Sequence, residues 1–265
     1  MARTNSRIAV TTAATLAVSV LIVPAPTAAA QKQRCPLIFG HGGYPKGPDA
    51  TVKDRIRQAN NPSALRDMRR WGADGVEADV QLTKRGTKAV MWHNTTTNGL
   101  NGPRRAITDL YWKTGPGALK FRRISRGPYK GERVYTLRSW LDYAAKLRLI
   151  VLLEVKPMAK RILASKTYGK EAWRQLSGPI LERQNDQPIM VYSFDPWIQE
   201  QLSKRHPSLL KDGHARWTDG VSWDEPPPGW KGNTTRWQSI FKLRPFSVMT
   251  NYPKQYRRWM ERRCT

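Results

Sequence analysis

The sequence has few cysteines and few long apolar stretches, and each shortage excludes a class of protein. Its 265 residues contain 2 cysteines, too few for the cysteine-rich sites that hold structural zinc. Beyond residue 30, no stretch is long and apolar enough to span a bilayer, which excludes a protein with several membrane spans. The chain also has no internal repeat and no low-complexity tract, which excludes repeat architectures.

The first 30 residues differ in composition from the rest of the chain. Arg3 and Arg7 precede an apolar run over residues 8–23, and the small-residue segment PAPTAAA follows it. A positive start, an apolar middle and an Ala-x-Ala end predict a secretory signal peptide that is cleaved after Ala30. Residues 31–265 would then form a single domain of a secreted protein. The alternative is that the apolar run anchors the chain in a membrane.

Basic residues far outnumber acidic ones. The chain has 46 Lys and Arg against 20 Asp and Glu, and without the two arginines of the leader its net charge is +26 − 2 = +24. Such a surface attracts anionic polymers, so an anionic cell-envelope polymer or a membrane surface is an expected partner. The positive charge is spread along the chain without a dense block, so no specific nucleic-acid partner is predicted. We expect a monomer.

The two cysteines, Cys35 and Cys264, stand near the ends of the predicted domain. In an exported protein they can form a disulfide bond, which would tie the first strand to the last helix. Two free thiols are the alternative.

Short apolar segments alternate with helical segments along the chain. We expect strands at residues 35–41, 75–81, 88–93, 149–156, 188–194, 220–223 and 246–250. We expect helices at 63–71, 137–147, 197–205 and 253–263, and a longer helical region between residue 157 and about 184. Nearly continuous apolar strands are typical of parallel sheets covered on both faces. The pattern predicts an α/β fold, a (β/α)₈ TIM barrel that is irregular or short of one strand between residues 224 and 245.

Four of these strands become polar toward their carboxyl ends. Side chains alternate between the two faces of a strand, so residues two apart share a face. The polar side chains on the otherwise apolar face are those of His41, Glu77, Asp79, His93, Glu154 and Lys156. Active sites of barrels lie at the carboxyl ends of the strands, so we expect these side chains to gather at one mouth. For residues 75–81 taken alone, the alternative is an exposed edge strand, in which polar and apolar residues would alternate in the same way.

These residue types suit metal-assisted attack on a phosphate ester. Glu77, Asp79 and Glu154 offer hard oxygen ligands, which Ca²⁺ and Mg²⁺ prefer. His41 and His93 can serve as general base and general acid, because histidine titrates near neutral pH. Lys156 is placed to contact a phosphoryl oxygen.

In these motifs the chain resembles the glycerophosphodiester phosphodiesterase family. The matching segments are FGHGG with PDAT, GADGVEADVQLTKRG, MWHN, LLEVKP, VYSFDP and VMTNYP. The resemblance implies a TIM barrel that hydrolyses a small phosphodiester, a glycerophosphodiester, to glycerol 3-phosphate and an alcohol with a divalent metal. It implies that His41 and His93 are the acid–base pair, that Glu77, Asp79 and Glu154 hold the metal, and that Lys156 contacts the phosphate.

The chain departs from the family pattern at several positions. Gly42 stands where the family has an arginine, so a bidentate phosphate contact is lost. Asp49 stands where the Pro-Glu-Asn-Thr segment of the family has glutamate, and Asn94 and Asn251 stand where the family has aspartates. These departures predict an enzyme with changed substrate placement.

Residues near these departures are expected to compensate for them. Lys46 or Arg104 would replace the lost arginine, and Asp49, Asn94 and Trp223 would contact the substrate.

Two other functions are compatible with the sequence. One is that of the secreted phospholipases D related to sphingomyelinase D, which share the barrel and the two histidines and act on phospholipid head groups. The Glu-x-Lys pair of Glu154 and Lys156 favours the diesterase over this group. The other is a catalytically weak binder of anionic envelope polymers, which the net charge and the altered phosphate-contacting residues support.

Overall fold

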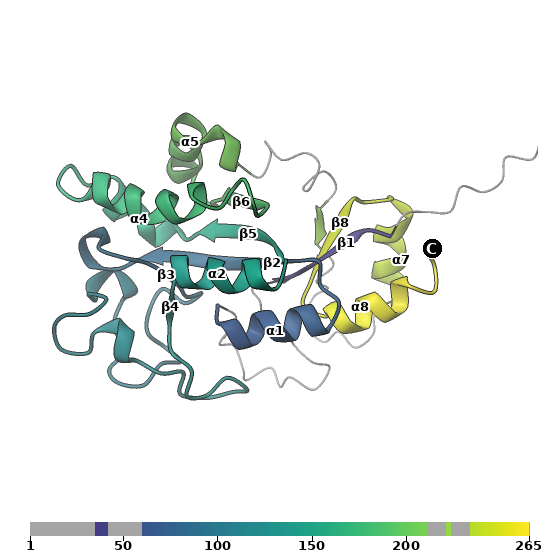
Figure 1. Ribbon diagram of the computed structural model, residues 1–265, viewed down its shortest axis with the longest axis horizontal. Coiled ribbons are helices and arrows are strands. Elements are labelled where there is room, and N and C mark those ends of the chain that lie inside the picture. The colour runs from purple at the N-terminus through teal and green to yellow at the C-terminus, as the bar shows by residue number, and fades with distance from the viewer. Residues whose placement is uncertain (1–34, 42–59, 211–220, 224–233, 265) are drawn as a thin grey trace, which may run out of the picture. The chain divides into compact units, whose positions relative to one another are not determined.

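The computed structural model describes residues 35–41, 60–210, 221–223 and 234–264. Its strands are β1 Leu37–Gly40, β2 Gly75–Leu82, β3 Ala89–Met91, β4 Tyr135–Thr136, β5 Ile150–Val155, β6 Ile189–Tyr192, β7 Val221–Trp223 and β8 Ser247–Thr250. Its helices are α1 Pro62–Arg70, α2 Leu137–Lys146, α3 Lys160–Leu163, α4 Gly169–Leu181, α5 Pro196–Arg205, α7 Thr234–Lys242 and α8 Pro253–Met260. All the predicted strands are present, and helices alternate with most of them (Figure 1).

The parallel strands follow the order β6–β5–β2–β1–β8–β7. The first and last strands of the chain are therefore neighbours, as in a barrel. Within the described residues no strand pairing joins β6 to β7, so the sheet is not closed there. This is the parallel α/β architecture that the sequence predicts, with its irregularity on the C-terminal side.

The prediction that residues 88–93 form a parallel barrel strand is wrong. β3 runs antiparallel to β2, with Val80 opposite Met91. Only residues 83–88 connect the two strands, whereas a parallel crossover needs a dozen or more residues. The connection turns at Arg85 and Gly86, whose φ angles are 58° and 67°. A side chain at Gly86 would also collide with Ala172, so the turn specifically needs glycine there.

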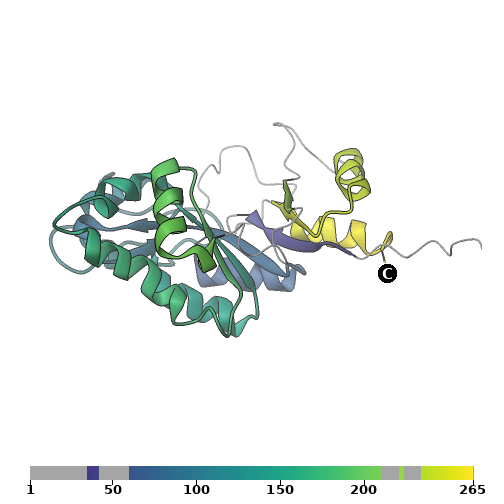
Figure 2. The same cartoon turned by 90° about the horizontal axis from the view of Figure 1, so that it is seen from above.

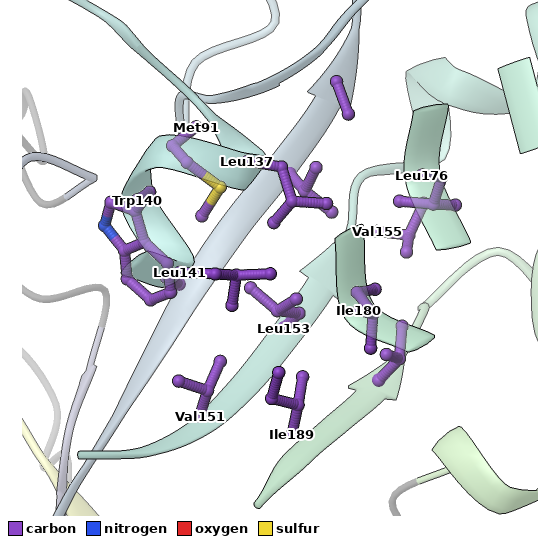
Figure 3. Close-up of a cluster of buried hydrophobic side chains, with 14 of the residues drawn as sticks. Met91, Leu137, Trp140, Leu141, Val151, Leu153, Val155, Leu176, Ile180 and Ile189 are labelled. Atoms are coloured by element: carbon purple, nitrogen blue, oxygen red, sulfur yellow. The ribbon is translucent and has the colours of Figure 1, made fainter. Parts of the chain in front are cut away.

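The two faces of the parallel strands carry separate apolar layers. On one face, Val151, Leu153 and Val155 of β5 pack against helices α2 and α4 (Figure 3). On the other face, Phe39, Leu152 and Met190 form a cluster to which Tyr192 and Met249 contribute. This second cluster is the interior of the barrel. Burial of both faces explains why these strands read as continuous apolar runs.

Side chains at the helix starts explain where the helices begin. The Asn61 side chain accepts a hydrogen bond from the backbone of Ala64, and that of Thr136 accepts one from Ser139. Both caps satisfy amide groups that the first helical turn leaves without partners.

Helices α2 and α4 lie side by side next to the strands (Figure 2).

The C-terminal part of the chain is tied to β1. Cys35 and Cys264 form a disulfide bond with a Cα–Cα distance of 5.3 Å, which confirms the predicted pair. Ile38, Trp237, Tyr256 and Met260 add an apolar cluster that joins β1 to α7 and α8. Helix α7 occupies residues 234–242, within the segment where the sequence predicts that a barrel strand is weak or missing. None of the helices in the described ranges is long and apolar enough to cross a membrane.

Candidate active site

Three carboxylates lie together where β2 pairs with β5. Glu77 and Asp79 share one face of β2, and Glu154 lies opposite Asp79 in the register of β5. One oxygen of each lies within 4.8 Å of the others, and the three residues are only 1, 1 and 6 % exposed. Carboxylates this close repel one another unless a cation lies among them. Their oxygens are the ligands of hard divalent cations, so the residues fit the predicted metal.

Lys156 lies beside the acids and also lines a cavity next to them. Its Nζ lies 2.9 Å from Glu154 Oε1 and 3.2 Å from Asp79 Oδ1. Burial alone would lower the pKa of Lys156, but attraction by Asp79 and the hydrogen bond to Glu154 outweigh it and raise the pKa. The ammonium group is therefore charged at neutral pH and can meet an anion beside the acids.

His41 follows β1 and lies beside Glu77. Its Nδ1 is 2.8 Å from Asn251 Oδ1, and its Nε2 is 3.8 Å from Glu77 Oε2. An amide oxygen can only accept a hydrogen bond, so Nδ1 carries the proton and Nε2 is the basic nitrogen of the neutral ring. Asn251 reaches the histidine because β8 pairs with β1 up to Gly40 and Thr250.

His93 lies beside the acid-bearing strand by a different route from the one predicted. Regular alternation would place it with Met91 in the helix-facing core, but β3 ends at Met91. The backbone N–H of Trp92 donates to the carbonyl of Asp79 at 3.1 Å, which keeps the chain next to β2. His93 then lines a cavity of about 290 Å³ that Lys156 also lines.

Asn94 lines the same cavity. Its Oδ1 lies 3.3 Å from Nδ1 of His93, and its backbone carbonyl accepts a 2.7 Å hydrogen bond from Gln81. Trp223 is the last residue of β7, and its contact with substrate stays a prediction. Asp49 and Lys46 lie outside the described residues.

Two residues that sequence reasoning missed contact the acids. Asn60, directly before the cap of α1, donates from Nδ2 to Asp79 Oδ2 at 3.1 Å and accepts from the Asp79 backbone N–H at 2.9 Å. Tyr192 donates from its hydroxyl to Glu77 Oε1 at 3.2 Å. Burial, followed by the charge of Glu77, raises the pKa of Tyr192, so the hydroxyl stays protonated.

The family model for glycerophosphoryl diester phosphodiesterases matches residues 59–245. The chain belongs to this family. A search of curated proteins found no significant match. The chain is thus a phosphoric diester hydrolase by family, and the resemblance seen in its motifs is confirmed.

Solved structures share the fold at low sequence identity. A protein assigned as a glycerophosphoryl diester phosphodiesterase from Silicibacter pomeroyi superposes with a TM-score of 0.60 at 15% identity, covering 86% of this chain and 94% of its own. A phosphodiesterase from Oleispira antarctica in complex with the product sn-glycerol-3-phosphate gives 0.59 at 16%, covering 86% and 97%. A glycerophosphoryl diester phosphodiesterase domain from Mycobacterium tuberculosis gives 0.55 at 11%, covering 85% and 99%. The fold of the family is the TIM barrel, which confirms the predicted fold class.

The family match also bears on Asn60. It begins at residue 59, so the segment directly before α1 belongs to the matched region, whereas PDAT at residues 48–51 lies outside it. Asn60 therefore lies within the matched region.

Proposed function

We propose that the protein hydrolyses glycerophosphodiesters to glycerol 3-phosphate and an alcohol, with the help of Ca²⁺ or Mg²⁺. The observation that carries this proposal is the cluster of three buried carboxylates with His41 on one side and Lys156 between the acids and a cavity. The product bound to the Oleispira antarctica phosphodiesterase is glycerol 3-phosphate, which supports the same product here.

The three acids would hold the metal. Glu77, Asp79 and Glu154 supply the oxygens, and Asn60 and Tyr192 orient two of them by hydrogen bonds. The bound cation would offset negative charge that develops on the phosphoryl oxygens. Lys156 would contact the same phosphate from the side of the cavity.

The two histidines would move the protons. His41 Nε2 takes the proton of the attacking hydroxyl, which by family resemblance belongs to the glycerol of the substrate itself. The bond from phosphorus to the alcohol oxygen breaks as the new bond forms, and His93 gives its proton to that oxygen. Water then opens the cyclic phosphate, with the histidines in exchanged roles. The hydrogen bond to Asn251 keeps the His41 ring in the form that this step needs.

A substrate panel tests the proposal. Glycerophosphocholine, glycerophosphoethanolamine, lysophosphatidylcholine and sphingomyelin are incubated with the protein in Ca²⁺ or Mg²⁺, and all products are identified. We expect glycerol 3-phosphate from the first two. Release of choline from only the two lipids would favour a phospholipase D-like enzyme instead. His41→Ala and His93→Ala should each reduce the rate by about 10²–10⁴-fold.

We also propose that the protein is exported and meets anionic surfaces outside the cell. The leader-like residues 1–30 and the disulfide bond support export. The net charge of +26 − 2 = +24 without the two leader arginines supports attraction to anionic lipid or polymer. Cosedimentation with anionic vesicles at low and high salt tests the second point, and binding that is indifferent to salt would contradict it.

A further inference from the structure

The cavity beside the acids has the composition of an anion site. Its lining includes His93, Asn94, Thr96, Asn98, Arg104 and Lys156. The charged side chains among them are cationic, and no carboxylate from the described part of the chain lines the cavity. Hydroxyl, amide and cationic groups are the donors that a phosphate accepts from.

We propose that Arg104 binds the phosphate of the substrate in this cavity together with Lys156. The proposal rests on the proposed function, because it assumes that the ester lies beside the three acids. Arginine stays charged at all pH values of interest, and its planar group can hold two phosphate oxygens at once. Lysine offers a single point charge. The pair would therefore fix both the position and the rotation of the phosphate.

The side chain of Arg104 is held in a way that suits this task. Its Nε donates to Thr96 Oγ1 at 3.3 Å. This is the one hydrogen bond that the arginine side chain makes within the described residues, so its two terminal NH₂ groups can donate to a ligand. Arg104 is exposed, so a substrate can reach it from solvent.

The backbone on both sides of Arg104 is anchored. The carbonyl of Pro103 accepts from Arg122 at 2.7 Å and from Thr97 Oγ1 at 3.0 Å. The N–H of Arg105 donates to Thr97 Oγ1 at 3.0 Å, and its carbonyl accepts from the Thr97 N–H at 2.8 Å. The loop that carries Arg104 is therefore an ordered platform.

Arg122 is the residue that organises this platform. It is only 4 % exposed and bonds Thr97 Oγ1 and the carbonyls of Asn101, Pro103 and Gly117. Burying the guanidinium group of Arg122 would destabilise the fold if its hydrogen bonds were not made. The loop conformation that supplies these oxygens is therefore favoured. Arg122 thus helps to hold the backbone of the loop that carries Arg104.

Arg105 provides a matched control. It follows Arg104 in the same loop and carries the same charge, but it does not line the cavity. Arg105→Ala therefore changes the net charge as much as Arg104→Ala does, without removing a group from the cavity. Any difference between the two variants reports on contact with the ligand and not on the general positive field.

The experiment measures binding and turnover in the full chain with Ca²⁺ or Mg²⁺ present. Calorimetry gives the Kd of sn-glycerol 3-phosphate, inorganic phosphate and glycerol for the wild type, Arg104→Ala, Arg104→Lys and Arg105→Ala. Arg104→Ala should weaken binding of both phosphates by about 10- to 100-fold and leave glycerol unchanged. Arg104→Lys should recover part of the loss, and Arg105→Ala should stay within about twofold. Added guanidinium ion should raise the turnover of Arg104→Ala.

Equal Kd values for Arg104→Ala and Arg105→Ala would overturn the proposal, as would a wild type that binds neither phosphate. Thermal unfolding of each variant shows that it is folded, and Arg104→Lys decides the matter if the alanine variant does not fold. Glycerophosphodiester turnover is scored separately. If the wild type turns over glycerophosphodiesters and Arg104→Ala binds phosphate as tightly as the wild type, only this inference is wrong. If phosphate binding depends on Arg104 but no glycerophosphodiester is hydrolysed, only the proposed function is wrong.

Discussion

His41 Nδ1 and Asn251 Oδ1 lie 2.8 Å apart, and this hydrogen bond decides which nitrogen of the histidine is basic. Asn251→Ala removes the acceptor, so the ring can turn or change tautomer. We expect kcat to fall by about 10- to 100-fold with KM within about twofold, because substrate contacts are untouched. Steady-state kinetics with glycerophosphocholine check this. An unchanged kcat would show that the hydrogen bond has no part in the reaction.

Asn60 and Asn61 are neighbours with different tasks, which makes them a natural pair of variants. Asn60→Ala removes both hydrogen bonds to Asp79 and should weaken the affinity for Ca²⁺ or Mg²⁺ by about 10- to 100-fold. Asn61→Ala removes the cap of α1 and should cost about 1 kcal/mol of stability without changing that affinity. Calorimetric metal titration and urea unfolding separate the two effects. A metal affinity that falls equally in both variants would contradict this division.

The acids at the site could be predicted from the sequence because strand alternation is a local rule. Glu77 and Asp79 are two residues apart, and Glu154 follows Leu152 in the same phase, so each strand by itself shows the inner face. The register between β2 and β5 then brings the three together. Nothing beyond periodicity and parallel pairing was needed.

The surroundings of the acids depend on contacts that no local rule gives. The alternation of residues 88–93 predicts a parallel strand that carries His93, although the six residues between β2 and β3 are too few for a parallel crossover and require a hairpin. The sequence identifies Tyr192 only as a strand residue, because its hydrogen bond to Glu77 spans 115 positions in sequence. Asn60 is not singled out by the sequence, because its hydrogen bonds to Asp79 join residues 19 positions apart.

The disulfide bond gives a prediction about stability. Cys35 and Cys264 are 229 positions apart, so the bond closes a long loop and restricts the unfolded chain strongly. The double variant Cys35→Ser/Cys264→Ser should lose roughly 2–5 kcal/mol of unfolding free energy. Urea unfolding of the variant against the oxidised wild type measures this loss. Coincident midpoints would mean that the bond does not stabilise the fold.

His206, at the end of α5, gives a prediction about pH. Burial, and then the neighbouring Arg205, lower the pKa of His206 in the folded protein. The unfolded chain therefore binds this proton more readily, and stability is lost as pH falls through about 6.5, the unfolded value. Between about pH 7.5 and 5 the Tm of the wild type should fall more than that of His206→Gln. Parallel Tm curves would contradict the assignment.

The central claim is that Glu77, Asp79 and Glu154 hold a divalent cation that the hydrolysis needs. The most direct measurement is the rate of glycerol 3-phosphate release by chelator-treated protein while Ca²⁺ or Mg²⁺ is added back. We predict that the treated protein is inactive, that activity returns with a saturable dependence on the metal, and that Asp79→Asn cannot be restored at the same concentration. Full activity in excess chelator would contradict the account.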